Sequence, residues 1–396
     1  MPEAVVHRLS IHPLLIPLRN KVVDAAAERG VADPVVVSVE LTNGLCGHGE
    51  TVPRPSVTGE TVDSVIQDLR ATFMESVMGF HLRSFPEALE AIESLPWQST
   101  QKRPVLAARA AIELALLDAS MRTFRRSLND AVQWMGLPAF GSPGSLPQIR
   151  FCGVLAGGTH DATLAQLRQM YWYGLRRFTL KVGFPEDLER LKLVLAYLRR
   201  PLTAGRAVLR LDANSGWSPD DAASRLAQIR GLPIAAIEQP LPRGREDALP
   251  QLRKDSEIPI VHDESLLTLE DARRLVELGP ADGFSIGISK CGGLLPSLRL
   301  AAFARRRGIG VHLGCMLAET GILSAAGLRF LEVCPAVTWA EGCYGRFLLR
   351  ADIASPSLRF RYGGRSPRPM GSGLGVELDA AKLEAHAERP PIAIQL

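Results

Sequence analysis

The sequence contains few lysines, no closely paired cysteines and no long apolar run. Its six cysteines form no C-x-x-C pair, so the sequence indicates neither a zinc site nor a disulfide framework, and reduced thiols in a cytoplasm fit best. No segment approaches about 18 uncharged apolar residues. The N-terminal stretch carries an acid and prolines where a signal peptide would need an apolar run. We therefore expect a soluble, cytoplasmic protein.

The net charge is also small. The chain has 46 basic and 42 acidic residues, a net charge of +4 over 396 residues, which predicts neither nucleic-acid nor membrane binding. Apolar residues make up 46% and charged residues 22%, which is the balance of a folded globular protein. At roughly 150 residues per domain, this length favours one large domain with a smaller one beside it.

Lysine is the scarce cation. Seven of the 46 basic residues are lysines and the other 39 are arginines. An arginine side chain stays protonated in proteins, whereas a buried lysine can lose its proton and act as a base. Each lysine is therefore a candidate for chemistry, although most lysines in proteins are solvated at the surface. The seven are Lys21, Lys102, Lys181, Lys192, Lys254, Lys290 and Lys382.

The N-terminal part of the chain has the pattern of an α+β domain, in which strand-like runs precede helical ones. The strand-like runs cover residues 7–17, 34–41 and 46–50, and the runs with helical periodicity cover 62–78, 85–94 and 105–124. The segment from Trp134 to Pro147 is rich in glycine, proline and serine, which is typical of a boundary. We predict a first domain over residues 1–135.

Short strands then alternate with amphipathic helices. The predicted strands lie near 149–154, 177–182, 207–212, 235–238, 259–262, 283–287, 310–313 and, weakly, 337–340. Helical patterns between them include 161–174, 186–200, 218–229, 268–278, 294–307 and 320–332. About eight such units in roughly 200 residues favour a TIM-type (β/α) barrel over a doubly wound open sheet. We predict a barrel over 148–345 and a tail, 346–396, that packs back on the first domain.

Three acids follow consecutive predicted strands. Asp212, Glu238 and Asp263 are separated by 26 and 25 residues, which is one βα unit each, so a barrel brings them together at its catalytic end. A lone acid there is more often a helix cap or part of a rim ion pair, but three in register repel one another unless a cation neutralises them. An all-oxygen set suits Mg²⁺ better than zinc. Asn214 is expected to orient these groups or to shape the turn.

Two of the seven lysines also stand at strand ends. Lys181 ends the second predicted barrel strand in FTLKVG, and Lys290 follows the sixth in FSIGISKCGG, so the two flank the acids from opposite sides. A ligand on the metal would lie between two amines. This arrangement suits removal of a proton from one face of a carbon and delivery of a proton to the other.

These motifs resemble those of the enolase superfamily and, within it, the muconate-lactonizing-enzyme subgroup of the mandelate racemase/muconate lactonizing enzyme family. The resemblance covers nearly the whole chain. Its motifs are GHGETVPRPSVTGET, LKVG, LDANSGW, IEQP, HDES, SKCGG, LGCMLAETGILSAAGLRF and GSGLGVELD. It implies an α/β fold, a modified (β/α)₇β barrel with an α+β capping domain built from the N-terminal part and the C-terminal tail.

The resemblance also implies a chemistry. Asp212, Glu238 and Asp263 would bind one Mg²⁺, and Lys181 and Lys290 would be the acid/base pair that removes the proton α to a carboxylate and gives an enolate stabilised by the metal. The expected partners are a small-molecule carboxylate substrate and further copies of the chain, with neither nucleic acid nor membrane.

The chain departs from the subgroup at several positions. Thr179 replaces the first lysine of the usual Lys-x-Lys, which removes a cation from the site and leaves a hydroxyl. Glu319 is offset by one residue from the usual acid, and it either orients substrate or Lys290 or caps the helix that follows. Arg54 is a candidate for pairing with a substrate charge, with solvation as the alternative.

The leading hypothesis is a Mg²⁺-dependent isomerase, either a racemase/epimerase or a cycloisomerase. A syn-dehydratase of the o-succinylbenzoate synthase or hydroxy-acid type is the first alternative, because one lysine can take the α-proton and then protonate the departing hydroxyl. A catalytically silent metal-binding barrel is an alternative of another class, motivated by Thr179. Loss of water from the product separates the first two hypotheses.

Overall fold

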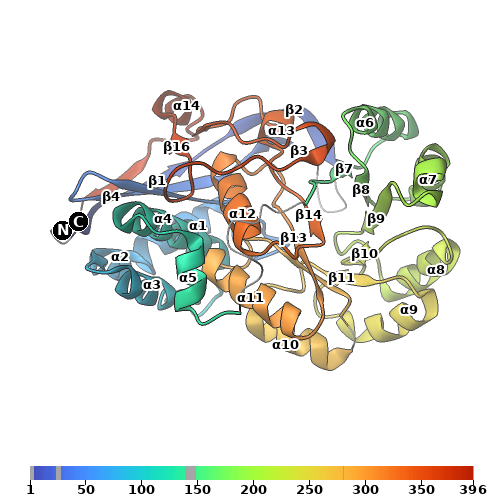
Figure 1. The fold of residues 1–396 in the computed structure, drawn as a ribbon, viewed down its shortest axis with the longest axis horizontal. Coiled ribbons are helices and arrows are strands. Elements are labelled where there is room, and N and C mark those ends of the chain that lie inside the picture. The colour runs from blue at the N-terminus through green and yellow to red at the C-terminus, as the bar shows by residue number, and fades with distance from the viewer. Residues whose placement is uncertain (1–3, 24–27, 139–148, 280, 396) are drawn as a thin grey trace.

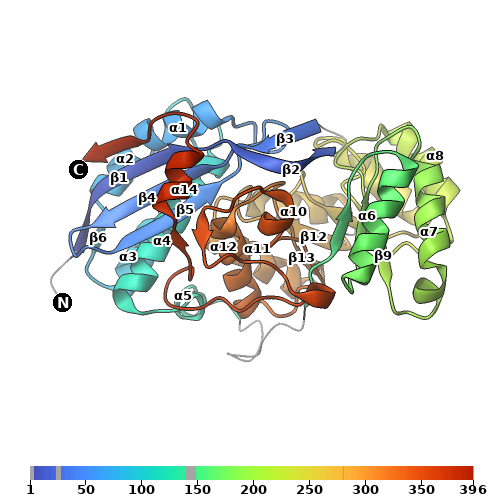
Figure 2. The same cartoon turned by 90° about the horizontal axis from the view of Figure 1, so that it is seen from above.

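The computed structural model describes residues 4–23, 28–138, 149–279 and 281–395. An antiparallel sheet at one end of the molecule has the strand order β17-β1-β4-β5, and β6 pairs with β1 (Figure 2). Its strands are β1 (Ala4–Pro13), β4 (Val35–Leu41), β5 (Cys46–Thr51), β6 (His81–Leu82) and β17 (Ile392–Gln395). β2 (Ile16–Val23) and β3 (Glu28–Ala32) form a separate hairpin that reaches from this sheet toward the second part of the molecule.

Helices cover one face of the antiparallel sheet. They are α1 (Val62–Ala71), α2 (Met74–Met78), α3 (Phe85–Glu93), α4 (Leu106–Phe124) and α5 (Leu128–Trp134). α4 packs against β5, where alanines of the helix meet the glycines of the strand motif C-G-H-G-E-T. A Cβ atom on Gly49 would lie 1.9 Å from the carbonyl oxygen of Ala111, and one on Gly47 would lie 2.2 Å from that of Ala115. The helix can therefore approach the strand only because these two positions lack side chains.

We expect the Gly49→Ala substitution to lower the free energy of unfolding by at least about 2 kcal/mol, because the added methyl group would overlap the α4 backbone. Thermal denaturation would measure the loss. Gly30→Ala is the matched control, since its added Cβ would meet only Lys21 Cγ, at 3.8 Å. That control is expected to stay within about 0.5 kcal/mol of the wild type. Equal stability of the two variants would contradict this account of the interface.

The second part is an eight-stranded parallel sheet with the strand order β14-β13-β12-β11-β10-β9-β8-β7. Its strands are β7 (Gly153–Leu155), β8 (Arg177–Lys181), β9 (Val208–Asp212), β10 (Ile237–Glu238), β11 (Ile260–His262), β12 (Gly283–Ile286), β13 (Gly310–Leu313) and β14 (Trp339–Ala340). The amide N–H of Cys152 donates to the carbonyl of Ala340 at 3.1 Å and so links the two edges of the curled sheet. The predicted TIM-type barrel is confirmed.

A helix follows each strand from β7 to β13 and covers the outside of the sheet (Figure 1). These helices are α6 (His160–Trp172), α7 (Asp187–Thr203), α8 (Pro219–Ile229), α9 (Leu249–Ser256), α10 (Leu269–Leu278), α11 (Leu294–Arg306) and α12 (Gly321–Val333), with a 3₁₀ turn η1 (Glu246–Ala248) before α9. Thr159, Ser218 and Thr268 cap α6, α8 and α10 with their hydroxyls, which explains where these helices begin. The last strand, β14, completes a (β/α)₇β order.

The C-terminal part of the chain returns to the antiparallel sheet. Its elements are α13 (Gly345–Leu348), β15 (Ala354–Ser355), η2 (Tyr362–Gly364), β16 (Glu377–Leu378), α14 (Ala380–Ala385) and β17. In the pairing of β17 with β1, Ile394 lies opposite Leu9. Most of the glycine- and proline-rich segment expected as a boundary lies outside the described residues. None of the described helices combines the length and the apolar character needed to cross a membrane.

Candidate active site

A cleft opens at the carboxyl ends of the barrel strands, beside the capping domain. It encloses about 760 Å³, counted with its open mouth. Seven of the residues singled out in the sequence line it: Arg54, Lys181, Asp212, Asn214, Glu238, Asp263 and Lys290. Arg29, Glu264, Cys315 and Glu341 also line it. Thr179 and Glu319 do not line it.

Strand register explains why these side chains meet. Lys181 of β8 is the ladder partner of Asp212 in β9, and Asp212 is in turn the partner of Glu238 in β10. Two positions earlier on both strands, Thr179 is paired with Arg210. Because side chains alternate along a strand, residues two apart share a face. Thr179 and Lys181 therefore share one face of β8, and Arg210 and Asp212 share one face of β9.

Lys181 is held by acceptors at the mouth of the barrel. Its Nζ donates to Asp212 Oδ2 at 2.5 Å and to Asn214 Oδ1 at 2.9 Å, and the amide of Asn214 donates in turn to Glu264 Oε1 at 3.2 Å. Burial by itself lowers the pKa of Lys181, but Asp212 and Glu341 outweigh burial, so its pKa lies above the usual range. In this arrangement Lys181 is an ammonium ion.

Lys290 faces the same cleft from the turn after β12 and is only 2% exposed. Its Nζ lies 2.8 Å from Asp263 Oδ1 and donates to the carbonyls of Leu266, at 3.0 Å, and Asp263. Burial opposes its protonation, but Asp263 prevails and the pKa of Lys290 is raised. Lys181 on β8 and Lys290 after β12 thus have β9, β10 and β11 between them, and each lies beside a predicted metal ligand.

Each of the three strand-end acids contacts a cationic side chain. Lys181 lies against Asp212, Lys290 against Asp263, and Arg210 Nη2 lies 2.7 Å from Glu238 Oε2. As these side chains stand, no group of three or more His, Cys, Asp or Glu residues in the described parts of the chain is spaced around a metal ion.

The donor chemistry nevertheless fits a hard divalent cation. Glu238 Oε2 is buried and has no hydrogen-bond partner, because its contact with Arg210 lacks hydrogen-bond alignment. Burial, together with the charges of Asp212 and Asp263, raises the pKa of Glu238 well above its usual range. An added cation would relieve this repulsion, and an all-oxygen set of carboxylates is what Mg²⁺ prefers.

The position that lost its lysine belongs to a buried network. Thr179 Oγ1 donates to Glu341 Oε1 at 2.7 Å and accepts from Arg210 Nε at 3.2 Å, while Arg210 Nη2 donates to the same Glu341 oxygen at 2.6 Å. Arg210 Nη1 lies 2.8 Å from His312 Nδ1. Burial alone would raise the pKa of Glu341, but Arg210 and Lys181 lower it to about 2. The hydroxyl of Thr179 therefore replaces a cation with a hydrogen bond.

The sequence interpretation missed Arg210 and Glu341. Arg210 precedes Asp212 by two residues, so strand alternation alone places it on the inner face of β9. Glu341 directly follows β14, as Asp263 follows β11, and the same strand-end rule would have identified it. The weakness of the last predicted strand hid this signal.

We expect Arg210→Met to lower the free energy of unfolding by about 3–5 kcal/mol, because Glu238 and Glu341 would be left buried without their common cation. Thermal denaturation at neutral pH tests this effect. Thr179→Val is the control from the same network, since it removes one neutral donor and is expected to cost about 1 kcal/mol. A loss no larger than that of the control would show that the guanidinium does not balance these carboxylates.

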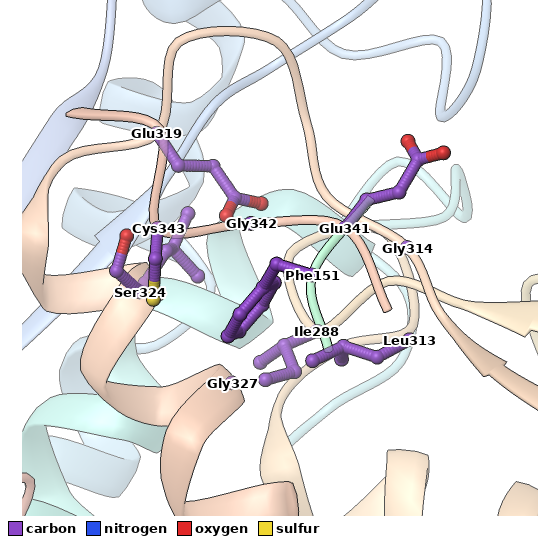
Figure 3. A pocket seen from close by; sticks show the side chains of 11 residues that line it. Phe151, Ile288, Leu313, Gly314, Glu319, Ser324, Gly327, Glu341, Gly342 and Cys343 are labelled. Atoms are coloured by element: carbon purple, nitrogen blue, oxygen red, sulfur yellow. The ribbon is translucent and has the colours of Figure 1, made fainter. Parts of the chain in front are cut away.

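Glu319 does not cap the helix that follows it, and its other predicted role, orienting substrate or Lys290, stays a prediction. Glu50 of β5 holds the start of α12, because its carboxylate accepts the N–H groups of Thr320 and Leu323 at 2.8 and 2.9 Å. Glu319 Oε1 accepts instead from the amide of Met316 at 2.6 Å. Glu319 lines a small cavity next to the cleft. Glu341 lines the same cavity, but Figure 3 shows its carboxylate pointing away from the cavity. Glu319 is thus folded against its own turn.

Arg54 is a buried residue rather than a solvated loop cation. It is 5% exposed, and its guanidinium donates to Asp33 Oδ1 at 2.7 Å and to the carbonyl of Leu317 at 3.2 Å. The Leu317 contact ties the capping domain to the loop after β13. Lys21, by contrast, has a side chain that is 74% exposed and pairs with Glu28.

The fold and the cleft together define a barrel enzyme with a capping domain. The barrel gathers carboxylates and two amines at the carboxyl ends of its strands. Two family profiles match the chain. The profile of the mandelate racemase/muconate lactonizing enzyme N-terminal domain covers residues 12–132, and that of the enolase C-terminal domain-like family covers residues 162–382. The chain belongs to the mandelate racemase/muconate lactonizing enzyme family of the enolase superfamily.

Relatives with a described activity share most of their length with this chain. An L-Lys-D/L-Arg epimerase of Methylococcus capsulatus is 34% identical over 81% of this chain and 85% of its own. An N-succinyl-L-Arg/Lys racemase of Bacillus cereus is 26% identical over 95% of this chain and 96% of its own. The chain is an enolase-superfamily isomerase.

Solved structures agree with the fold. The 2-chloromuconate cycloisomerase of Rhodococcus opacus superimposes with a TM-score of 0.83 at 26% identity, covering 97% of this chain and all of the other. A dipeptide epimerase from Cytophaga hutchinsonii, whose structure contains Mg and the dipeptide D-Ala-L-Val, gives a TM-score of 0.81 at 21% identity over 99% and 100% of the two chains. At least one protein of this fold therefore has a structure that contains Mg.

Proposed function

We propose that the protein is a Mg²⁺-dependent racemase or epimerase that moves the proton α to the carboxylate of a small acid. The observation that carries this proposal is the placement of two amines, Lys181 and Lys290, on opposite sides of one cleft with the acids Asp212, Glu238 and Asp263 between them. A proton transfer that inverts a carbon needs one group on each face of that carbon. The cleft offers this pair, whereas a dehydratase needs only one lysine.

The side chains of this chain have separable tasks. One lysine, as the neutral amine, takes the α-proton and becomes an ammonium ion, while the other, as an ammonium ion, gives a proton to the opposite face and becomes the neutral amine. The two exchange these tasks when the reaction runs backward. Asn214 donates to Glu264 and accepts from Lys181, which fixes the direction of the Lys181 amine. When bound by the three carboxylates, Mg²⁺ would stabilise the negative charge that develops on the substrate and would replace the lysines as their counterion.

The substrate is expected to be a small N-substituted amino acid or a dipeptide. Two relatives act, by their names, on lysine- or arginine-containing compounds. Glu264 and Glu341 line the cleft and are acceptors for a basic side chain, whereas Arg29 and Arg54, which line it too, are donors suited to a substrate carboxylate. N-succinyl-L-arginine, N-succinyl-L-lysine and L-lysyl-L-arginine are therefore the first compounds to test.

Incubation of the protein and Mg²⁺ with each compound, followed by chromatography on a chiral phase, tests the proposal. We expect the inverted isomer to accumulate at unchanged mass, and chelation of the metal to stop the reaction. A product lighter by one water would identify a dehydratase, and a lactone formed from a muconate would identify a cycloisomerase. Bound Mg²⁺ without turnover of any compound would favour the silent barrel.

A further inference from the structure

The loop that carries Lys290 is closed by hydrogen bonds from the N–H of Cys291 to the carbonyl of Gly287 at 2.9 Å and from the N–H of Gly293 to that of Ile288 at 3.0 Å, but it does not cap the helix that follows. This Lys290 loop, residues 287–295, is the connection from β12 to α11 together with the first two residues of α11. The N-cap of α11 is Gly293, which has no side chain to accept the free N–H groups of the first turn. No acidic residue lies in that first turn either. The start of α11 must therefore be satisfied from elsewhere.

A carboxylate of the capping domain supplies the missing cap. Glu113 of α4 is fully buried, and its Oε2 and Oε1 accept the N–H groups of Leu294 at 3.1 Å and Leu295 at 2.8 Å. A Cβ atom on Gly293 would lie 2.4 Å from the Glu113 carboxyl carbon, and the backbone there has a φ of +121°. Glycine at this position is thus required both for the backbone conformation and for the approach of the carboxylate.

A second side chain of α4 grips the same loop. Arg109 stands one helical turn before Glu113, is 1% exposed, and donates from Nη1 to the carbonyl of Gly292 at 2.6 Å. Its other nitrogens donate to the carbonyls of Leu95, Ile92 and Glu93, at distances of 3.3 to 3.4 Å. The guanidinium also lies 4.0 Å from the ring centroid of Trp97. The end of α3 and the residues that follow it therefore hold the Arg109 side chain in place for its contact with the loop.

The capping domain holds the other side of Lys290 as well. Thr51 of β5 shares a hydrogen bond of 2.8 Å with the hydroxyl of Ser289, and the amide of Val52 donates to the same hydroxyl at 3.2 Å. Thr51 and Ser289 are both buried. Lys290 is thus bracketed by capping-domain contacts at the residue before it and at the residues two to five positions after it.

We propose that Glu113, Arg109 and Thr51 are positioning residues for Lys290, because they fix the backbone from which its amine reaches Asp263 and Leu266 of the barrel. Lys181 stands apart from these contacts, because its strand neighbours and Asn214 hold it within the barrel. The capping domain therefore controls proton transfer on one face of the substrate carbon. This inference rests on the proposed function, in which the two lysines serve opposite faces.

The test compares proton exchange on the two faces in one variant. Each enantiomer of a substrate is incubated separately in D₂O with Mg²⁺, and the first exchange of its α-proton is followed by mass spectrometry. In Glu113→Gln, the side-chain NH₂ group faces one of the two backbone N–H groups that the Glu113 oxygens accept, so two donors meet. We expect it to slow exchange on the face served by Lys290 by about 10- to 100-fold, as a small misplacement of a reacting group does, and to leave the other face within about twofold. Burial raises the pKa of Glu113 to about 7, so the assay is run above that pH, where the wild-type carboxylate is ionised.

Asp118→Asn is the matched control. Asp118 lies on the same helix, is equally buried, and also accepts two backbone N–H groups, from Leu374 at 2.7 Å and His48 at 3.0 Å, away from the loop. The control is expected to leave the ratio of the two exchange rates unchanged. Should Glu113→Gln fail to fold, Thr51→Val, which removes one hydroxyl without changing the size of the side chain, is expected to shift the ratio in the same direction.

Amide hydrogen exchange of the Lys290 loop gives a second readout that needs no substrate. We expect faster exchange of residues 287–295 in Glu113→Gln and no change in Asp118→Asn. Equal slowing of both faces, or faster loop exchange with an unchanged ratio, would overturn the positioning role. A wild type that exchanges neither enantiomer would instead refute the proposed function, and unchanged loop protection in Glu113→Gln would then refute the capping contact independently.

Discussion

Exchange of the substrate α-proton on one face only is the expected result for Lys290→Met. Methionine is unbranched like lysine, lacks only its terminal amine position, and fits a site that is 2% exposed, but it cannot carry a proton. We expect exchange on the Lys290 face to fall by at least about 1,000-fold, in line with the loss of a general acid/base, while Lys181 continues to serve the other face. Inversion of either enantiomer stops, because it needs both amines.

Lys181→Met is the mirror control and should remove exchange on the opposite face. Deuterium exchange of each pure enantiomer, read by mass spectrometry at early times, distinguishes the two variants. Lys290→Met also leaves the carbonyls of Asp263 and Leu266 without their donor, which costs about 1–3 kcal/mol of stability. Folding is therefore checked by circular dichroism first. If both variants lost exchange on the same face, the division of labour between the lysines would be wrong.

Loss of Mg²⁺ binding together with activity is the second large effect, and we expect it from Asp212→Asn and from Glu238→Gln. Each substitution keeps the shape of the side chain and removes one of the negative charges that repel one another in the cleft. We expect kcat/KM to fall by at least about 1,000-fold and the rise of the melting temperature on addition of Mg²⁺ to disappear.

Glu319→Gln is the control for these variants. Glu319 is a nearby carboxyl that faces the small neighbouring cavity rather than the cleft (Figure 3). We expect this variant to keep the Mg²⁺-dependent shift of the melting temperature. If Asp212→Asn kept the same shift, the three strand-end acids would not be the metal ligands.

The barrel could be predicted because its signal repeats along the chain. Acids and lysines stand at the ends of predicted strands one βα unit apart, and parallel strands bring such positions to one edge. Asp212, Glu238, Asp263, Lys181 and Lys290 were found in this way, and all line the cleft. Their spacing along the sequence needed no knowledge of packing.

The rest of the site depends on contacts between distant segments. Arg54 could not be recognised as buried, because its partners Asp33 and Leu317 come from different parts of the chain. The helix-capping alternative for Glu319 was wrong for the same reason, since Glu50, from the capping sheet, holds the start of α12 in its place. Neither pattern is visible in a local window of sequence.

Replacement of the usual lysine by Thr179 illustrates a further limit. From sequence alone this substitution removes a cation and puts the reaction in doubt. In the structure, the buried guanidinium of Arg210 donates to the Thr179 hydroxyl, and both side chains donate to Glu341. The effect of a substitution in one strand can thus be interpreted only when the side chains of the neighbouring strand are known.

The most direct test of the two-lysine account is the isotopic composition of the first product formed in D₂O. A single enantiomer of a turned-over substrate is incubated with the wild-type protein and Mg²⁺, and the inverted isomer is isolated at low conversion. We predict that this isomer carries one deuterium at the α-carbon with no loss of water, because the proton delivered comes from a solvent-exchanged amine on the opposite face. An inverted isomer that retains the original proton would contradict transfer between two separate lysines.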